Sequence, residues 1–150
     1  MHKISTEKEG QSMNPQAKDP HAVVSSLRNP KGYTCDITTR DHQLVADEPE
    51  PLGGEDHGPT PYEYLKAALG SCTAITLRMY AERKKWPLED AVVTIRHSRD
   101  SHKESVFERD IKLVGELDNE QRLRLMAIAD RCPVHKTISH GASILTKLVD

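Results

Sequence analysis

The segment from Pro61 to Trp86, PYEYLKAALGSCTAITLRMYAERKKW, constrains the fold more than any other part of the chain. Apolar and small side chains recur along it at helical spacing, which predicts one long helix. Thr60 can cap this helix, and Pro61 suits its first position. Only Lys66 and Arg78 are charged in its middle turns, so we expect the helix to be mostly buried as the central element. The predicted buried stripe comprises Leu65, Ala68, Leu69, Cys72, Thr76 and Met79.

The rest of the chain shows strand patterns and a second, shorter helix. The expected strands cover residues 22–27, 32–39, 42–46, 91–99, 106–117 and 143–149. The second helix is expected over residues 118–130, with Asp118 and Gln121 forming a capping box, and a short continuation follows Pro133. Strands and helices do not alternate regularly, so an α+β fold with an antiparallel sheet is favoured over a parallel doubly wound one. The polar residues 1–20 predict a flexible tail, which leaves residues 21–150 as a single domain.

Composition limits the classes of function. A chain of 150 residues fits one domain, and its few aromatic residues (one Trp, one Phe) predict a lean core that a partner chain helps to bury. The net charge is −2 and the positive residues are scattered, which argues against binding to nucleic acid or to an anionic membrane. No apolar run approaches the roughly 18 residues that a membrane span requires. The first residues lack the apolar core of a signal peptide, so the three cysteines are expected in a reducing cytosol.

Two of the cysteines lie in the same local pattern. Cys72 and Cys132 each follow apolar residues seven, four and three positions earlier, which places each thiol on the apolar face of a helix where the two could meet. Inert packing is the ordinary explanation for such a thiol. Cys132, however, precedes Pro133, which favours a position at the N-terminus of the next helix, where backbone N–H groups and Arg131 favour a thiolate. Cys35 lies among polar neighbours and is interpreted as structural or incidental.

Other groups of polar residues give weaker indications of a metal site, a hydrolase or a phosphate-binding loop. His97, Asp100 and His102 suggest a metal site, but a polar hairpin turn usually leaves such residues solvated. Four residues around the Pro/Gly/acid-rich loop 46–61 could hold a divalent ion, namely His42, Asp47, Asp56 and His57. A Cys–His hydrolase built from Cys132 and His135 lacks any accompanying nucleophile turn or oxyanion hole. Gly53-Gly54 is not followed by the Lys-Ser/Thr of a phosphate-binding loop.

Two blocks of sequence resemble the OsmC/Ohr family. PTPYEYLKAALGSCTAITLRMYAERKKWPLE is similar to the family's central helix with its first cysteine, and ERDIKLVGELDNEQRLRLMAIADRCPVHKTI is similar to the segment around its second cysteine. The resemblance covers roughly residues 30 to 149. It implies an α+β fold whose two subunits interleave into a homodimer, with the active sites at the interface.

The resemblance also implies an activity, the reduction of organic hydroperoxides. By this resemblance Cys72 would be the peroxidatic thiolate and Cys132 the resolving thiol, without any resident cofactor or metal. The oxidised Cys72 would condense with Cys132 to a disulfide, and an external dithiol, in this family typically a lipoyl group, would restore the thiols by exchange.

The family also uses an Arg held by a Glu to keep the first thiol ionised. Glu63 matches the Glu, although nine residues of straight helix place it about 13 Å along the axis from Cys72, so the helix end must bend or a partner subunit must supply the group. The usual Arg position falls at Leu52, in a loop without Arg. Arg40 is the favoured substitute and Arg28 the next. The departure keeps a second hypothesis open, a non-enzymatic module that senses redox state or binds a hydrophobic ligand.

Overall fold

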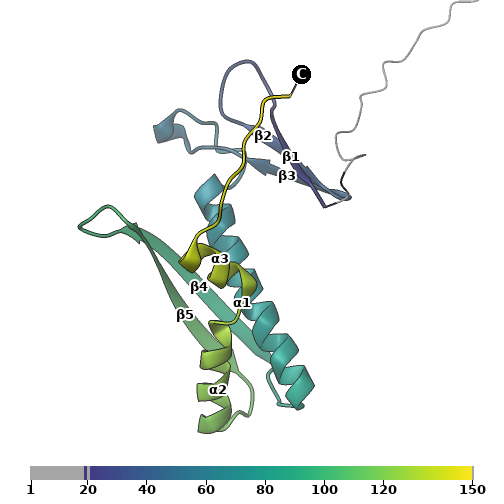
Figure 1. The fold of residues 1–150 in the computed structure, drawn as a ribbon, viewed down its shortest axis with the longest axis vertical. Helices are drawn as coiled ribbons and strands as arrows, with labels where there is room; N and C mark the ends of the chain where they lie inside the picture. The colour runs from purple at the N-terminus through teal and green to yellow at the C-terminus, as the bar shows by residue number, and fades with distance from the viewer. Residues whose placement is uncertain (1–18, 20, 150) are drawn as a thin grey trace, which may run out of the picture. The chain divides into compact units, whose positions relative to one another are not determined.

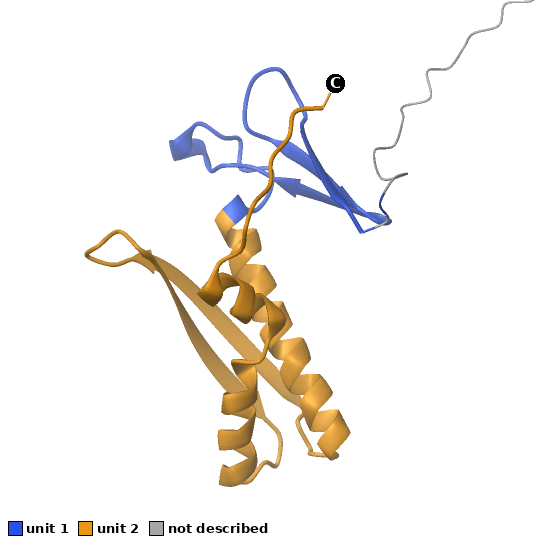
Figure 2. Ribbon diagram, viewed as in Figure 1, with its two compact units in different colours: residues 1–61 blue, residues 62–150 orange. Residues whose placement is uncertain are grey.

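The computed structural model describes residues 19 and 21–149, in two compact units (Figure 2). Unit 1 comprises residues 1–61 and unit 2 comprises residues 62–150. The predicted tail of residues 1–20 lies outside the described residues, except for Asp19.

Unit 1 is a three-stranded antiparallel sheet in the order β1-β2-β3. Its strands are β1 (Val23–Leu27), β2 (Cys35–Thr39) and β3 (His42–Ala46), which confirms the three strands expected here. Thr39 pairs with His42, so Arg40 and Asp41 form a tight turn in which Arg40 adopts a positive φ of 50°. A short 3-10 helix, η2 (Glu50–Leu52), follows within the acidic loop.

Unit 2 contains a β-hairpin and three helices (Figure 1). The long helix α1 (Pro61–Lys84) leads into the antiparallel pair β4 (Asp90–Arg99) and β5 (Ser105–Val114). Helices α2 (Asn119–Ala129) and α3 (Pro133–His140) complete the unit. Asp118 and Gln121 form the predicted capping box at the start of α2. The mixture of antiparallel strands and helices confirms the α+β class.

The core of unit 2 forms where α1 and α2 pack on one face of the hairpin. Its buried members come from both helices and from the connections that flank the hairpin: Leu77, Tyr80, Ala81, Leu88, Leu117, Leu125, Ile128 and Ala129. The hairpin contributes alternate, partly buried residues, among them Ala91, Ile111 and Leu113. The alternation predicted for β5 is therefore confirmed, although the strand ends at Val114 rather than at residue 117. Gly115 ends it with a φ of 130°, at a point where a Cβ atom would lie 2.0 Å from the backbone oxygen of Pro87.

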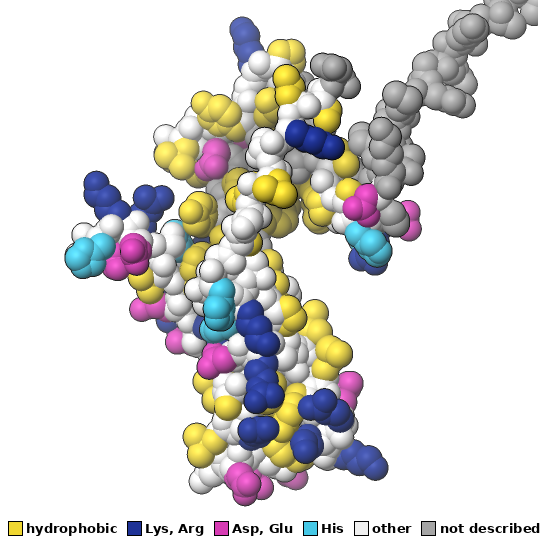
Figure 3. Space-filling model, viewed as in Figure 1, with side chains coloured by type: hydrophobic (Ala, Val, Ile, Leu, Met, Phe, Trp, Pro, Cys, Tyr) yellow, Lys and Arg dark blue, Asp and Glu magenta, His cyan; other side chains and the backbone are white. Residues whose placement is uncertain are grey.

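The buried stripe of α1 differs from the predicted one. The buried residues are Leu69, Thr73, Leu77, Tyr80 and Ala81, whereas Ile75 and Met79 are 58 % and 65 % exposed. The prediction of a mostly buried helix is thus wrong for the single chain. A helix that is apolar on several faces does not show in its sequence which face meets its own hairpin. Figure 3 shows hydrophobic side chains left at the surface of unit 2 over the region of α1.

The strand expected over residues 143–149 is absent, because residues 141–149 form no regular element. Ile144, Leu145 and Leu148 are almost fully exposed, with Leu145 at 96 %. Period-2 apolar patterning predicts a strand only where an unpaired edge is available to receive it. The prediction of this last strand is wrong for the chain taken alone.

Candidate functional site

Cys132 occupies the N-cap of α3, as the Cys-Pro sequence predicts. Pro133 fills the first helical turn, where the missing N–H costs no hydrogen bond. The backbone N–H of His135 donates to Cys132 Sγ over 3.5 Å. The thiol is fully buried. Local sequence therefore places this sulfur among backbone donors that stabilise negative charge.

Cys72 lies midway along α1, and its side chain is hydrogen-bonded to that of Cys132. Both cysteines are free thiols, with Cys72 partly exposed and Cys132 buried. The structure thus brings together the two thiols that lay sixty positions apart in the printed sequence. The remaining cysteine, Cys35, begins β2 in unit 1, where it pairs with Ala46 across the sheet.

The two thiols differ in acidity. Burial, followed by the hydrogen bond with Cys132, raises the pKa of Cys72 above its ordinary value. Burial also opposes ionisation of Cys132, but hydrogen bonds from Cys72, from the N–H groups of His135 and Val134 and from Thr73 hold the pKa of Cys132 below its ordinary value. Of the two thiols, Cys132 is therefore the one that ionises first, with Cys72 donating the hydrogen bond that stabilises its charge.

Arg109 is a residue of this site that sequence reasoning missed. Its side chain, 14 % exposed, extends from β5 and donates to Thr73 Oγ1 and the backbone oxygen of Ala129, each over 3.1 Å. It also pairs with Asp130 at 2.7 Å. Position 109 lies on the apolar face of β5, between Phe107 and Ile111. A charged residue on the apolar face of an amphipathic strand is the sequence feature that could have identified Arg109 as a site residue.

Unit 2 contains two pockets of about 400 Å³, each lined by residues that neighbour the thiols rather than by the thiols themselves. The first lies between α1, β5 and α3 and is lined by Leu69, Ser105, Val106, Phe107, Arg109, His135, Ile138 and Ser139. The second is lined by Thr76, Met79, Tyr80, Arg83, Ile128, Arg131 and Pro133. Thr76 hydrogen-bonds to Cys72, and Arg131 and Pro133 flank Cys132, so the second pocket adjoins the pair. An apolar molecule bearing a small polar group fits such a lining.

Glu63 lies on the same helix as Cys72, whereas Arg40 belongs to unit 1. Glu63 lies exposed in the first turn of α1, and this helix is unbroken from Pro61 to Lys84. Glu63 therefore stays nine residues along the same helix from Cys72. Arg40 is exposed in the β2–β3 turn of unit 1. Arg28, the other upstream candidate, pairs with Asp36 at 2.7 Å in the same unit.

The residues suggested as metal ligands have other roles in the structure. The ring of His97 stacks between Tyr62 and Phe107, with centroid separations of 4.7 Å to each. Asp100 accepts from the N–H groups of His102 and Glu104 and so organises the hairpin turn. His135, the suggested partner in a Cys–His hydrolase, contacts Cys132 through its backbone N–H, and its ring Nδ1 lies 4.0 Å from Asp130.

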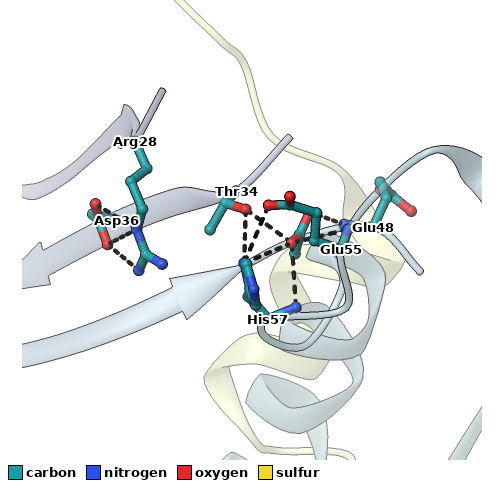
Figure 4. Close-up of polar contacts among 7 residues, drawn as sticks. Arg28, Thr34, Asp36, Glu48, Glu55 and His57 are labelled. Atoms are coloured by element: carbon teal, nitrogen blue, oxygen red, sulfur yellow. Dashed lines mark hydrogen bonds and ion pairs between the residues drawn. The ribbon is translucent and has the colours of Figure 1, made fainter. Parts of the chain in front are cut away.

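The acidic loop of unit 1 is organised by the buried carboxylate of Asp47. Asp47 accepts from Thr34 Oγ1 at 2.9 Å and from the N–H groups of Glu48, Glu55 and His57. Figure 4 shows Thr34, Glu55 and His57 turned toward one another around this network. Ligand atoms of Asp47, Glu55 and His57 lie within 4.8 Å of one another, so Glu55 takes the place predicted for Asp56. Because the Asp47 carboxylate is already fully hydrogen-bonded, we interpret it as a loop-organising group and assign it no metal ion.

Comparisons with known proteins agree with this architecture. The family model described as OsmC-like protein matches residues 53–147. An OsmC-like protein from Mycoplasma pneumoniae superposes with a TM-score of 0.67 at 15% identity, covering 79% of this chain and 86% of that one. No curated protein matches the sequence.

Two further structures belong to proteins named for hydroperoxide resistance. The organic hydroperoxide resistance protein OsmC from Legionella pneumophila gives a TM-score of 0.55 at 23% identity, with 79% of this chain and 89% of that chain covered. An organic hydroperoxide resistance protein from Elizabethkingia anophelis gives 0.57 at 16% identity, with 77% and 85% covered. At these identities the likeness establishes the fold.

Proposed function

The chain belongs to the OsmC-like protein family, and we propose that it is a thiol-dependent peroxidase that reduces organic hydroperoxides through Cys72 and Cys132. The observation that supports this most directly is the hydrogen-bonded pair of free thiols at the N-terminus of α3. A sulfenic acid formed on one thiol lies beside the second, which is the arrangement that disulfide formation needs. The names of the Legionella and Elizabethkingia proteins are consistent with the proposed substrate class.

The two thiols divide the reaction according to exposure. Cys72, the exposed member, meets the peroxide, while Cys132 accepts the proton of Cys72 as attack begins. Cys72 Sγ attacks the hydroxyl oxygen of ROOH, the S–O bond forms and the O–O bond breaks. The leaving alkoxide takes the proton from Cys132 and departs as the alcohol. Cys72 is thereby oxidised to the sulfenic acid and the peroxide is reduced.

Cys132, again a thiolate, then attacks the sulfur of the Cys72 sulfenic acid. An S–S bond forms, and the hydroxide that leaves becomes water with a proton from solvent. An external dithiol, for which we propose a lipoyl group, reduces the disulfide by two successive exchanges. No resident cofactor or metal ion enters this scheme.

The homodimer and the cytoplasmic location are also proposals. The exposed apolar residues of α1, Ile75 and Met79 in particular, are consistent with burial against a second copy. In such a dimer, Glu63 could act on the Cys72 of the other subunit, since the unbroken α1 keeps it from its own. Among residues 19 and 21–149, no helix combines the length and apolarity that crossing a bilayer requires.

Steady-state turnover with cumene hydroperoxide and dihydrolipoamide tests the peroxidase. We expect Cys72→Ser to abolish turnover, because the attacking sulfur is lost. Cys132→Ser should oxidise Cys72 only once and more slowly, because the group that accepts the Cys72 proton is lost, and it should form no intramolecular disulfide. Cys35→Ser is the matched control and should retain turnover. Full turnover by Cys72→Ser would end the proposal.

The raised pKa of Cys72 favours one alternative, a redox-sensing or hydrophobic-ligand-binding module that reacts slowly. Intact-mass spectrometry separates the two functions. A peroxidase forms the Cys72–Cys132 disulfide within seconds of adding sub-stoichiometric peroxide and recycles with the dithiol. A sensor or binding module oxidises slowly, or co-purifies with an apolar ligand.

A further inference from the structure

Arg109 connects the three elements that meet at the thiols. Its guanidinium group reaches from β5 to Thr73 on α1 and to Ala129 and Asp130 at the end of α2. Cys132 follows directly after this end of α2 and begins α3. A charged side chain in the apolar register of a strand is costly unless its hydrogen bonds are satisfied. The contacts with Thr73, Ala129 and Asp130 satisfy it.

Thr73 is the link between Arg109 and Cys132. Its hydroxyl is fully buried and donates to the backbone oxygen of Leu69 at 2.7 Å, while the Sγ of Cys132, whose pKa it lowers, is a second acceptor for the same proton. Because Arg109 donates to Oγ1, it uses a lone pair of this oxygen and leaves the hydroxyl to act as a donor. It also polarises the O–H bond, which strengthens donation to a thiolate.

We propose that Arg109 is a positioning residue which, through the hydroxyl of Thr73, keeps Cys132 as the ionised member of the thiol pair. The role of this ionisation in catalysis rests on the proposed peroxidase function.

The other charged and titratable groups near Cys132 explain why the influence passes through Thr73. Cys72 approaches from α1, Asp130 and Arg131 lie in the turn before Cys132, and His135 follows on α3. Asp130 pairs with Arg109 at 2.7 Å and offsets much of its charge. The direct field of Arg109 at the sulfur is therefore weak, whereas the hydrogen bond relayed by Thr73 is short-ranged and directional.

Thiolate absorbance in the ultraviolet, followed against pH in a Cys35→Ser, Cys72→Ser background, reports the ionisation of Cys132 alone. Thr73→Val removes the hydroxyl at nearly constant volume, and we expect it to move the midpoint upward by about one pH unit, a roughly tenfold weaker ionisation. Thr73→Ser keeps the hydroxyl and should restore the midpoint. Arg109→Met should produce a rise of similar size.

The double variant Thr73→Val, Arg109→Met is the decisive measurement. If Arg109 acts through Thr73, the double variant rises no further than Thr73→Val alone. Arg122→Met is the matched control, since Arg122 binds the backbone oxygens of Leu113, Gly115 and Leu117 and does not contact the thiols. An unchanged midpoint in Thr73→Val, or a fully additive rise in the double variant, would overturn the inference. If Arg109→Met does not fold, Thr73→Val and Thr73→Ser still decide whether the hydroxyl acts on Cys132. Arg109→Lys then replaces Arg109→Met in the single and double variants.

These titrations require neither peroxide nor reductant, so they are separate from the test of the proposed function. If the variants show the expected thiolate midpoints but the parent protein has no peroxidase turnover, the inference about Arg109 stands and the proposed function is wrong. If the parent protein turns over peroxide but the thiolate midpoints of the variants do not move, the proposed function stands and the inference about Arg109 is wrong.

Discussion

At the scale of single residues, two buried polar groups organise their surroundings in the same way. Thr73 in unit 2 and Asp47 in unit 1 are both nearly inaccessible to solvent, and each is surrounded by hydrogen-bond partners. Such groups stabilise one arrangement of their neighbours, because any other arrangement leaves a buried polar atom unsatisfied. Asp47 determines the loop conformation, and Thr73 links a cation to a thiol.

Asp47 makes the stability of unit 1 depend on pH. Burial opposes its ionisation, but the hydrogen bonds from Glu48, His57, Thr34 and Glu55 hold the pKa of this carboxyl below its ordinary value. The unfolded chain therefore binds a proton over an interval in which the folded chain does not. The stabilisation is complete above the unfolded-state pKa and is lost as the pH falls through the folded-state pKa.

Asp47→Asn should flatten this acid dependence and lower stability at neutral pH, because the variant has no charge to lose and brings an NH₂ group among N–H donors. Denaturant unfolding from neutral to acid pH measures the first effect. Hydrogen exchange at the amides of Glu48, Glu55 and His57 measures the second. Asp56→Asn, at an exposed position of the same loop, is the control and should follow the parent curve. Identical acid dependence in Asp47→Asn and the parent would contradict this role.

At the scale of elements, α2 shows that the contribution of a leucine to stability depends on its burial. Leu125 is fully buried in the core of unit 2, whereas Leu123, two positions earlier on the same helix, is 73 % exposed. The carboxyl end of α2 leads directly to Cys132, so packing at Leu125 also fixes the start of α3.

Leu125→Ala should destabilise the chain by about 2–5 kcal/mol, since it removes buried methyl groups and leaves a cavity. Leu123→Ala should change the stability by no more than about 0.5 kcal/mol. Chemical denaturation of the two variants makes the comparison. Equal losses would show that Leu123 is covered in solution by something other than its own chain.

At the scale of the whole molecule, the main feature is apolar surface that the single chain does not bury. Ile75 and Met79 on α1 are more than half exposed, and the C-terminal residues Ile144, Leu145 and Leu148 have almost no contacts. Exposed apolar side chains grouped on one helix face commonly mark an interface. The proposed homodimer would cover them.

Ile75→Glu should shift the assembly toward monomer, because an interface would have to bury an unpaired carboxylate. Sedimentation equilibrium measures the association. Lys84→Gln, an exposed change at the end of the same helix, is the control and should leave association unchanged. A parent chain that is monomeric at all concentrations would contradict the dimer.

The sequence by itself predicted the elements whose signals are local. Capping residues at Asp118 and Gln121, the Cys-Pro start of α3 and the alternation in β5 depend on neighbours a few positions away, and the structure confirms each of them. The paired cysteine patterns also indicated correctly that Cys72 and Cys132 could meet.

Tertiary structure alone decided which face of α1 is buried, that residues 143–149 form no strand in the single chain, and that Arg109 reaches Thr73 beside the thiols. The reason is that these outcomes depend on which surfaces are available to pack against. A helix that is apolar on several faces can bury any of them, and its packing partners determine which one. A segment with a strand pattern forms a strand only where a free sheet edge is available to pair with it. The lowered pKa of Cys132 relative to Cys72 is of the same kind, because it depends on hydrogen-bond donors contributed by α1 and α3 together.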